Sequence, residues 1–353
     1  MVTSSAYAPL AWVGMQPGHR ALYRWSGRAI VDGADREWSL ILKVSRRDPD
    51  TDREAAWNYW KREFLAYTSG VLDGLPGIAA PRLLGSSERE RELTLLWLED
   101  VPESVLGPWP AERYGLAARH LGTFNGAYLA DRPLPEQSFF TRTYLRSWTS
   151  WLPWIDAVRS AATWSDPLVA HEFPEPPIAR LERLHDAVPD LFDRLERLPQ
   201  TLSHLDAWRA NLIGSRLPDG RERTVAIDWS FIGTAPAGQE LAITVGGSHV
   251  WLDADPEELT VLSDRAFSAY MAGMRDAGWR GDGRTVRFAY AASAALYAAP
   301  LLPLWLGRIA DPTRRGWIER KCRRPAAEVV RGWALLLDHM LDLADEAYQL
   351  AAI

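Results

Sequence analysis

Hydrophobic and polar positions divide the chain into a first part with strand-like alternation and a longer part with helical spacing. Residues 37–47, EWSLILKVSRR, alternate, so that Lys43 shares one strand face with Ser39 and Ile41. Residues 92–100, ELTLLWLED, predict another apolar strand. Between them, residues 52–67 repeat at three- and four-residue steps and predict a helix, one side of which carries Ala56, Tyr59, Trp60, Glu63 and Tyr67.

Beyond residue 100 most segments have helical spacing. Residues 111–130 and 325–348 are clear examples, and the second begins with a proline that suits the first turn of a helix. Residues 288–309 carry no charge until Arg308 and resemble a membrane span in length. Because this stretch is rich in alanine and contains Pro300 and Pro303, we expect a buried helix that breaks near Pro300. The fold class that these patterns predict is α+β, with a small mixed part before a larger helical part.

One polar segment interrupts the helical part. Residues 202–212 read LSHLDAWRANL, and residues 224–233 read TVAIDWSFIG. Turn residues at 218–220 separate two short apolar runs, one ending at 212–213 and one returning at 225–227, which predicts a hairpin. The hairpin would bring Asn211 close to Asp228, and two such oxygen ligands suit a hard cation such as Mg²⁺. The alternative is a surface loop in which Asp206 caps a helix and Asp228 is a turn residue.

These motifs resemble those of protein kinases and, more closely, those of the aminoglycoside phosphotransferase and choline kinase family. That family usually reads HGDxxxxN and IDWxxxxxGxxxxDLA, where this chain reads HLDAWRAN and IDWSFIGTAPAGQELA. The resemblance implies that Asp206 is the catalytic base and that His204 braces its loop. It also implies that Asn211 and Asp228 are the ligands of Mg²⁺.

The same resemblance implies a bilobal protein-kinase-like fold. Residues 1–100 would form a small N-lobe with an antiparallel sheet that binds the nucleotide. Residues 101–353 would form a larger, mostly helical C-lobe with the catalytic loop and the acceptor site. The chain departs from the family pattern at Leu205, where glycine is usual, and at Glu240, where aspartate is usual. Neither departure removes a reacting group.

Phosphoryl transfer in this fold also uses a lysine that binds the α- and β-phosphates and a glutamate that holds the lysine. Lys43, flanked by Leu42 and Val44, is the candidate, and a lysine that protects an edge strand is the alternative. Its predicted partner is Glu63 in the segment REFLAY, with Glu54 as the second choice. The alternative is a solvent-facing glutamate.

Two further elements of nucleotide binding are expected from the resemblance. The chain has no GxGxxG motif, and Gly14 and Gly18 in GMQPGHRALYRW belong either to a loop that covers the phosphates or to an ordinary hairpin turn. The nucleobase would meet the backbone where the strand at 92–100 ends, near Leu98, Glu99 and Asp100.

Residues that would contact the acceptor are less sharply defined. Twelve of the 18 tryptophans follow residue 100, and the stripe of Trp148, Trp151 and Trp154 either lines a sugar or aromatic site or packs helices together. Arg209 either steadies the transferred phosphoryl group as a catalytic residue or pairs with Glu240 or another carboxylate.

Charged segments leave similar alternatives open. Residues 308–324 carry seven basic and two acidic side chains, which form a solvated face or receive an acidic peptide or a phosphorylated ligand. A polycationic acceptor would need acidic groups that converge on one cleft. The candidates are Glu172, Glu175, Asp253, Asp255, Glu257 and Glu258.

Composition narrows the class of protein. A chain of 353 residues with 47% hydrophobic residues permits a sizeable core, and a net charge of −6 argues against a general nucleic-acid binder. The single cysteine, Cys322, excludes an intramolecular disulfide framework and fits a reducing cytosol. The N-terminus lacks the basic start and apolar run of a signal peptide. We therefore expect a cytoplasmic protein without a nucleic-acid or membrane partner.

The leading hypothesis is a phosphotransferase that requires ATP (or GTP) and Mg²⁺. It would move the γ-phosphoryl group to a hydroxyl of a small molecule such as an antibiotic, a sugar or an amino alcohol. The basic segment and the tryptophans leave open a kinase that acts on Ser or Thr of a peptide or protein. The missing glycine-rich loop and the altered motifs leave open a non-catalytic binding module on the same fold.

Overall fold

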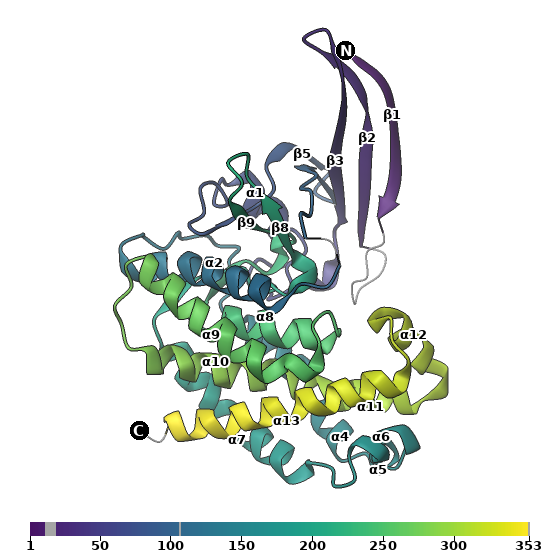
Figure 1. Cartoon of the computed structure of the whole chain (residues 1–353), viewed down its shortest axis with the longest axis vertical. Helices are drawn as coiled ribbons and strands as arrows, with labels where there is room; N and C mark the ends of the chain where they lie inside the picture. The colour runs from purple at the N-terminus through teal and green to yellow at the C-terminus, as the bar shows by residue number, and fades with distance from the viewer. Residues whose placement is uncertain (11–18, 106, 352–353) are drawn as a thin grey trace.

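The structure, a computed structural model, describes residues 1–10, 19–105 and 107–351 (Figure 1). Its first part contains a five-stranded antiparallel sheet in the order β1-β2-β3-β6-β5. The strands are β1 (Val2–Leu10), β2 (Arg20–Val31), β3 (Ala34–Arg46), β5 (Leu83–Arg89) and β6 (Leu93–Glu99). The two strands predicted from the alternation are β3 and β6, which pair side by side and place Lys43 opposite Leu96.

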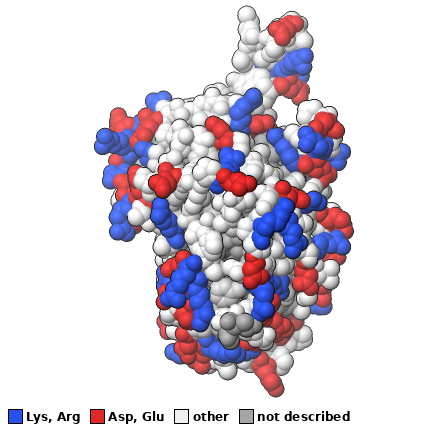
Figure 2. All heavy atoms as spheres, turned by 90° about the vertical axis from the view of Figure 1, so that its left-hand side faces the viewer, with Lys and Arg blue, Asp and Glu red and all other residues white. Residues whose placement is uncertain are grey.

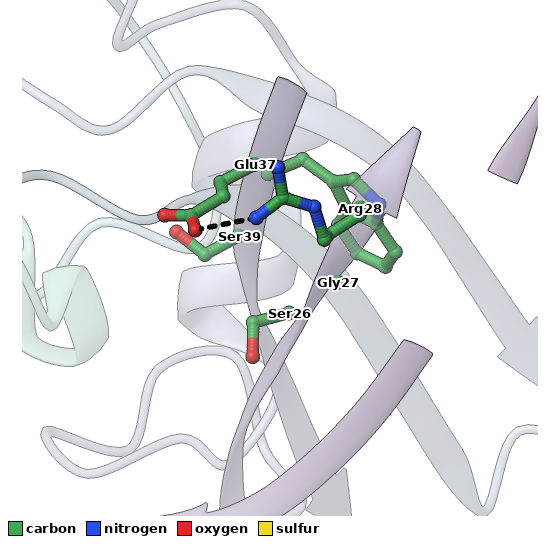
Figure 3. A pocket seen from close by; sticks show the side chains of 6 residues that line it. Ser26, Gly27, Arg28, Glu37 and Ser39 are labelled. Carbon is green, nitrogen blue, oxygen red and sulfur yellow. Dashed lines mark hydrogen bonds and ion pairs between the residues drawn. The ribbon is translucent and has the colours of Figure 1, made fainter. Parts of the chain in front are cut away.

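Strands β1, β2 and β3 extend beyond the rest of the molecule as a long arm (Figure 1). The β2–β3 turn contains Asp32 and Gly33, whose φ angles of 52° and 76° suit a two-residue hairpin turn. A hollow of about 390 Å³ lies on this arm, nearer its tip than Lys43 (Figure 3). It is bordered by Ser26, Gly27, Arg28, Glu37, Trp38 and Ser39.

Helix α1 (Arg62–Thr68) is shorter than the helix predicted over residues 52–67, and the fully buried side chain of Arg62 is the reason. The Arg62 guanidinium donates hydrogen bonds to the backbone carbonyl oxygens of Glu54, Ala56, Trp57, Phe139 and Ser230. The first three of these carbonyls precede α1 and would otherwise serve the hydrogen-bond ladder of a longer helix. The last two belong to the second part of the chain, so Arg62 also ties the two parts together.

The second part consists mainly of helices (Figure 1). The long helices are α2 (Ala111–Ala130), α7 (Ile178–Arg197), α8 (Gln239–Val250), α9 (Leu259–Asp276), α10 (Gly283–Ala298) and α13 (Ala326–Ala351). The shorter ones are α3 (Tyr144–Trp151), α4 (Trp154–Val158), α5 (Ala161–Trp164), α6 (Pro167–Glu172), α11 (Leu301–Ala310) and α12 (Pro312–Cys322). Helices α2 and α9 approach closely because Gly122 faces Tyr270, where a Cβ atom would lie only 2.0 Å from the carbonyl oxygen.

The apolar stretch at 288–309 is a buried helical segment that breaks near Pro300, as predicted. Helix α10 ends at Ala298, and α11 begins at Leu301. Within the described part of the chain, Gly283–Ala310 is the one stretch long and apolar enough to cross a membrane, and 94% of its most apolar window is buried inside the fold. Such burial is typical of the core helix of a globular protein.

Charged side chains of both signs are interspersed over the face of the molecule in Figure 2. No single sign dominates among the residues visible there, in keeping with the formal net charge of −6. This face therefore lacks the extended basic surface by which proteins usually attract nucleic acid phosphates.

Two small sheets support the polar segment. Strands β4 (Ile78–Ala79), β9 (Glu222–Ala226) and β8 (Leu212–Arg216) form one, and β7 (Gln200–Ser203) pairs with β10 (Gly233–Pro236) in the other. The predicted hairpin is thus present, but residues 212–213 begin β8 rather than end a strand. The reason is a turn of 3-10 helix, η2 (Arg209–Asn211), which precedes β8 and leaves 212–216 to pair with β9. The other short 3-10 turns are η1 (Pro49–Thr51), η3 (Trp229–Phe231) and η4 (Pro256–Glu258).

Helix α8 is buried along its whole length and carries His249 near its end. The Nδ1 atom of His249 lies 2.8 Å from the carbonyl oxygen of Val245, and burial lowers the pKa of the imidazole to about 4. In the unfolded chain the pKa is about 6.5, so the unfolded state binds a proton more readily. The stability that neutral His249 contributes is therefore present above about pH 6.5 and is lost as the pH falls toward 4.

As the pH falls from the unfolded-state pKa of His249 to its folded-state pKa, the free energy of unfolding of the natural chain should fall. We expect this fall to exceed that of the His249→Gln variant by on the order of 3 kcal/mol. Urea denaturation of both proteins at several pH values measures this difference, in which the contributions of other titrating groups cancel. His171→Gln is the matched control, because the His171 side chain is 81% exposed. A difference that does not change with pH would contradict a buried neutral imidazole at position 249.

Candidate active site

The loop between β7 and β8 places Asp206 and Asn211 in direct contact. The Asn211 Nδ2 atom donates hydrogen bonds to the Asp206 Oδ2 atom at 2.7 Å and to the Asp206 carbonyl oxygen at 2.9 Å. The η2 turn makes this contact possible, because it folds the chain back between the two residues. One amide side chain therefore orients the carboxylate and closes the loop around it.

His204 is fully buried beneath this loop. Its Nε2 atom lies 2.8 Å from the carbonyl oxygen of Ile227, and its Nδ1 atom accepts a hydrogen bond of 3.2 Å from the Asp206 N–H group. These contacts suit the neutral tautomer with hydrogen on Nε2, and burial lowers the pKa of the ring to about 4. The imidazole thus links the loop to the end of the hairpin and is poorly suited to accept a proton at neutral pH.

Glu240, at the start of α8, holds the same loop from the other side. Its Oε2 atom accepts a hydrogen bond from the His204 N–H group at 2.6 Å, and its Oε1 atom accepts one from the Leu205 N–H group at 3.1 Å. Burial raises the pKa of Glu240 to about 7. Leu205 has a φ angle of 65°, in the left-handed region that glycine adopts with least strain. This conformation gives a physical reason for the glycine that the resembled motif usually has here.

A cluster of charged side chains lies where the five-stranded sheet meets the hairpin. The Lys43 Nζ atom is 2.5 Å from Glu63 Oε2 and 2.8 Å from Asp228 Oδ1. Arg20, from β2, lies 3.6 Å from the same Asp228 oxygen and donates a hydrogen bond of 2.8 Å to Ser230 Oγ. The Ser230 hydroxyl donates in turn to Asp228 Oδ1 at 2.5 Å. Asp228 is therefore the point at which the sheet, α1 and the hairpin meet.

The predicted pairing of Lys43 with Glu63 is present. Both residues are only 5% exposed, so the edge-strand lysine and the solvent-facing glutamate are excluded as alternatives. Glu54, the second choice, forms no ion pair with Lys43 among the described residues and instead offers its backbone carbonyl to Arg62. The turns between residues 52 and 61, which shorten α1, place Glu54 away from the lysine.

Asp206 and Asp228 have different electrostatic environments. Burial raises the pKa of Asp206 well above its usual range, and the negative charge of Asp228 raises it further. Burial also opposes the ionisation of Asp228, but the Lys43 ammonium and then the Arg20 guanidinium hold its pKa below the usual range. Neighbouring carboxylates with pKa values pushed apart are typical of acid–base sites, where one group stays ionised and the other takes up a proton.

Arg209 pairs with a carboxylate, as the second of its two predicted alternatives has it, and its role toward the phosphoryl group stays a prediction. Its guanidinium lies 3.3 Å from Glu103 Oε2 and donates a hydrogen bond of 3.0 Å to the Leu212 carbonyl oxygen. The guanidinium also stacks over the Trp109 ring at 4.2 Å. The partner is not Glu240, whose oxygens already accept from the loop backbone. Arg209 thus connects the loop of Asp206 and Asn211 to the segment after β6.

The residues predicted to lie beside the nucleobase are at the end of β6. Leu98 is buried and pairs with Ile41 of β3. The Asp100 carboxylate accepts hydrogen bonds from the Arg24 guanidinium at 2.8 Å and 3.2 Å. Strand β6 therefore ends where the sequence predicted, next to Leu98 and Asp100. The contact of this strand end with a nucleobase stays a prediction. Gly14 and Gly18, the candidates for the phosphate-covering loop, lie outside the described residues.

Three residues of this site were not predicted from the sequence: Arg20, Ser230 and Glu103. Arg20 meets Asp228 only because β2 pairs with β3 and carries the guanidinium to the same end of the sheet as Lys43. Glu103 follows β6 and accepts a hydrogen bond from the Gly214 N–H group at 2.9 Å. Ser230 stands two residues after Asp228 in the chain. Of the three residues, only Ser230 could have been assigned to the site from its position in the sequence.

Two tryptophans of the predicted stripe contact each other and the third packs elsewhere: the ring centroids of Trp148 and Trp151 are 6.1 Å apart, whereas Trp154 packs against His185. Trp148 is buried and stacks on Tyr297, with ring centroids 5.9 Å apart. Trp154 is buried and packs edge-on against His185. Trp151 is 54% exposed. The packing alternative therefore describes Trp148 and Trp154, because both rings are buried against residues of other helices.

The sequence profile of the phosphotransferase enzyme family matches residues 24–280. This match covers most of the chain and includes Lys43, Glu63 and both motifs. The chain belongs to this family, as the motifs predicted, and is therefore a phosphotransferase. A search of curated proteins finds no match.

Solved structures share the kinase-like fold. Amicoumacin kinase hAmiN, in complex with AMP-PNP, Ca²⁺ and Ami, is similar with a TM-score of 0.52 and 12% identity over 92% of this chain and 87% of that one. Spectinomycin phosphotransferase APH(9)-Ia, in complex with ADP and spectinomycin, has a TM-score of 0.48 and 13% identity over 93% and 92% of the two chains. Ethanolamine kinase from Plasmodium vivax has a TM-score of 0.48 and 12% identity over 98% and 82%. At this identity the likeness concerns the fold alone. The likeness to amicoumacin kinase, with the antiparallel sheet of the first part and the helices of the second, confirms the predicted bilobal kinase-like fold.

Proposed function

We propose that this protein transfers the γ-phosphoryl group of ATP or GTP to a hydroxyl group of a small molecule. The observation that carries the proposal is the cluster at Asp228. There the Lys43 ammonium from β3 contacts both the buried Glu63 carboxylate of α1 and Asp228 at the end of the hairpin. His204 joins that end of the hairpin to the loop of Asp206 and Asn211. Family membership supports the same reaction, and the similar solved structures include kinases of amicoumacin and ethanolamine.

In this proposal Asp206 accepts the proton of the acceptor hydroxyl. The hydroxyl oxygen forms a bond to the γ-phosphorus while the bond from that phosphorus to the bridging oxygen breaks, and the nucleoside diphosphate leaves with the electron pair. The raised pKa of Asp206 suits proton uptake, and the hydrogen bond from Asn211 keeps the carboxylate oriented. His204 and Glu240 hold the loop in place, so most of the catalysis is positioning.

Asp228 and Asn211 carry oxygen donors of the kind that Mg²⁺ takes. Mg²⁺ is commonly held by one or two protein groups, with water and substrate phosphates as its other ligands. Asn211 uses its amide nitrogen to hold Asp206, so its side-chain oxygen is the atom that would meet the ion. Asp228 would be the second protein ligand, since Lys43 and Arg20 keep it ionised. When bound, the ion would neutralise negative charge on the phosphates.

Lys43 would bind the α- and β-phosphates, and Glu63 would keep its ammonium in place. The nucleobase would lie beside Leu98 and Asp100 at the end of β6. In this proposal residues 1–100 bind the nucleotide, and residues 101–353 carry the catalytic loop and the acceptor site. Arg62 and the pairing of β4 with β9 connect the two parts, which is consistent with a site built at their boundary.

A thermal-shift assay with ATP, GTP and a non-hydrolysable analogue, each with and without Mg²⁺, tests the proposal. We expect a rise in melting temperature that requires Mg²⁺. At a nucleotide concentration about 100 times the Kd, binding to the native state adds roughly 2.7 kcal/mol of stability. Mg²⁺ alone and AMP with Mg²⁺ are the controls. The absence of a shift with any nucleoside triphosphate would contradict the proposal.

A further inference from the structure

Four tryptophans from separate segments form a continuous aromatic surface beside the catalytic loop. We call it the tryptophan wall, and it consists of Trp208 in the loop, Trp251 after α8, Trp305 in α11 and Trp317 in α12. The ring centroids of Trp208 and Trp251 are 6.4 Å apart, those of Trp251 and Trp305 are 5.5 Å apart, and those of Trp305 and Trp317 are 5.4 Å apart. Trp208 and Trp251 are half-buried, so part of the wall faces solvent next to the loop.

The wall lies close to the proposed base. Trp208 is two positions after Asp206, and a Cβ atom at Gly247 would lie only 2.8 Å from the Trp208 Cβ atom. The glycine therefore lets α8 support the loop directly under this indole. The Arg209 N–H group, which follows Trp208, also donates to Ser248 Oγ at 3.1 Å. These contacts hold the Trp208 ring in place relative to Asp206.

Positive charge is built into the wall. The Lys321 Nζ atom lies 5.5 Å from the Trp208 ring centroid and 4.8 Å from that of Trp251. The Arg308 guanidinium lies 4.4 Å from the Trp305 ring centroid. Such cation–π contacts fix both charges against the indoles. Burial lowers the pKa of Lys321, and the carboxylates that oppose this effect include Asp206, so the ammonium lies within electrostatic reach of the base.

Three of the acidic residues that a polycationic acceptor would need have partners within the protein. Asp255 accepts a hydrogen bond from the backbone of its own turn, and Glu257 pairs with Arg331 at 2.5 Å. Asp253 interacts electrostatically with Lys321, as Asp206 does. Burial raises its pKa, and three basic side chains oppose this effect, namely Arg323, Arg209 and Lys321. The charge of Asp253 is therefore balanced within the protein.

We propose that the tryptophan wall is the acceptor subsite, and that it selects a hydroxyl compound with a flat apolar ring and a negatively charged group. The ring would stack on Trp208 and Trp251. The charged group would be attracted by Lys321, which leaves the hydroxyl to reach Asp206. A polycation is disfavoured, because it would meet like charges at Lys321 and Arg308. The inference rests on the proposed function and names the substrate class for the same site.

Three probes with one ring and one alcohol test this selection. They are 3-(hydroxymethyl)benzoate, its methyl ester and 3-(hydroxymethyl)benzylamine, which carry a negative charge, no charge and a positive charge. Isothermal titration calorimetry on the full chain measures each Kd, with and without a non-hydrolysable ATP analogue and Mg²⁺. We expect the benzoate to bind about tenfold more tightly than the ester, as for one charge-assisted contact, and the amine to bind most weakly.

Variants of the tryptophan wall test whether its residues cause the preference for the negatively charged probe. Lys321→Met should remove the roughly tenfold preference for the benzoate and leave the affinity for the ester unchanged. Trp208→Leu should weaken all three probes by a similar factor. Arg320→Met is the matched control, because Arg320 is an exposed cation on the same helix. Among the described residues, the cation–π contacts with Trp208, Trp251 and Trp305 come from Lys321 and Arg308. It should keep the preference of the natural chain.

Several outcomes would overturn the inference. They are equal affinity for the three probes, tightest binding of the amine, no binding of the benzoate, or the same loss of preference in Arg320→Met and Lys321→Met. Failure of the proposed function has a different signature, the absence of a Mg²⁺-dependent thermal shift with nucleotide. The probe affinities are measured without turnover, so the two failures are distinguishable.

Discussion

Asp206→Asn is expected to lower kcat about a thousandfold and to leave the affinity for Mg²⁺-nucleotide nearly unchanged. Asparagine has almost the shape of aspartate but cannot take the proton of the acceptor hydroxyl. Asn211 would still donate to residue 206, because the new amide oxygen can replace Oδ2. Release of nucleoside diphosphate in the presence of an accepted hydroxyl compound measures kcat, and the thermal shift measures binding.

The same variant should be at least as stable as the natural chain. Because burial and the charge of Asp228 raise the pKa of Asp206, the folded state binds its proton more tightly than the unfolded state. The ionised carboxylate therefore costs stability at pH values above its ordinary pKa, and a neutral amide removes that cost. Urea denaturation near neutral pH measures the change. Lost activity with retained or increased stability is the expected signature of a functional carboxylate.

Asp186→Asn is the control for this experiment, because the Asp186 side chain is 86% exposed and its one close partner is His185. Neither activity nor stability should change in it. Full activity of Asp206→Asn would show that another group accepts the proton. A parallel loss of stability and activity would instead show that Asp206 acts by holding the loop.

Lys43→Met is expected to abolish detectable nucleotide binding and to destabilise the fold by about 3 kcal/mol. The methionine stem fills the space of the lysine, but the ammonium that lies between Glu63 and Asp228 is gone. The buried Glu63 carboxylate and the partly buried Asp228 carboxylate then face each other, and Arg20 is the cation that remains near Asp228. Urea denaturation measures the loss of stability, and the Mg²⁺-dependent thermal shift measures the loss of binding.

Lys61→Met provides the matched comparison. Its ammonium pairs with Glu88 at 2.7 Å nearer the surface, and removing such a pair costs about 0–1 kcal/mol. The double variant Lys43→Met/Glu63→Gln should recover part of the lost stability, because one unpaired buried charge is removed with the lysine. It should not recover nucleotide binding. Recovery of binding in the double variant would mean that Lys43 acts only as the counterion of Glu63.

Local patterns predicted the parts of the site that lie close together in the chain. The spacing of His204, Asp206 and Asn211 belongs to one loop, and the hairpin to Asp228 follows from turn residues between two apolar runs. Alternation placed Lys43 on a strand with apolar neighbours. Helical spacing placed Glu63 on the following helix, although it predicted too long a helix. Residues 288–309 were correctly predicted as buried, since their prolines and alanines suit a broken core helix.

Contacts between segments that are far apart in the sequence could not be predicted from these local patterns. The long helix predicted over 52–67 is shortened because the Arg62 guanidinium takes the carbonyls of the preceding residues and also binds Phe139 and Ser230. Arg209 could pair with any of several carboxylates, and only the path of the chain after β6 brings Glu103 to it. A side chain with several possible partners is not assigned by its neighbours in sequence.

The sequence by itself determined the family, the division into a strand-rich first part and a mostly helical second part, and the candidate reacting groups, because each depends on residue type and short spacing. Only the tertiary structure decided which tryptophans share a surface. The predicted stripe at Trp148, Trp151 and Trp154 is divided by the end of α3, whereas Trp208, Trp251 and Trp305 come together from separate segments. The physical reason is that a surface built by packing helices depends on their relative positions, which long-range burial and close backbone contacts set.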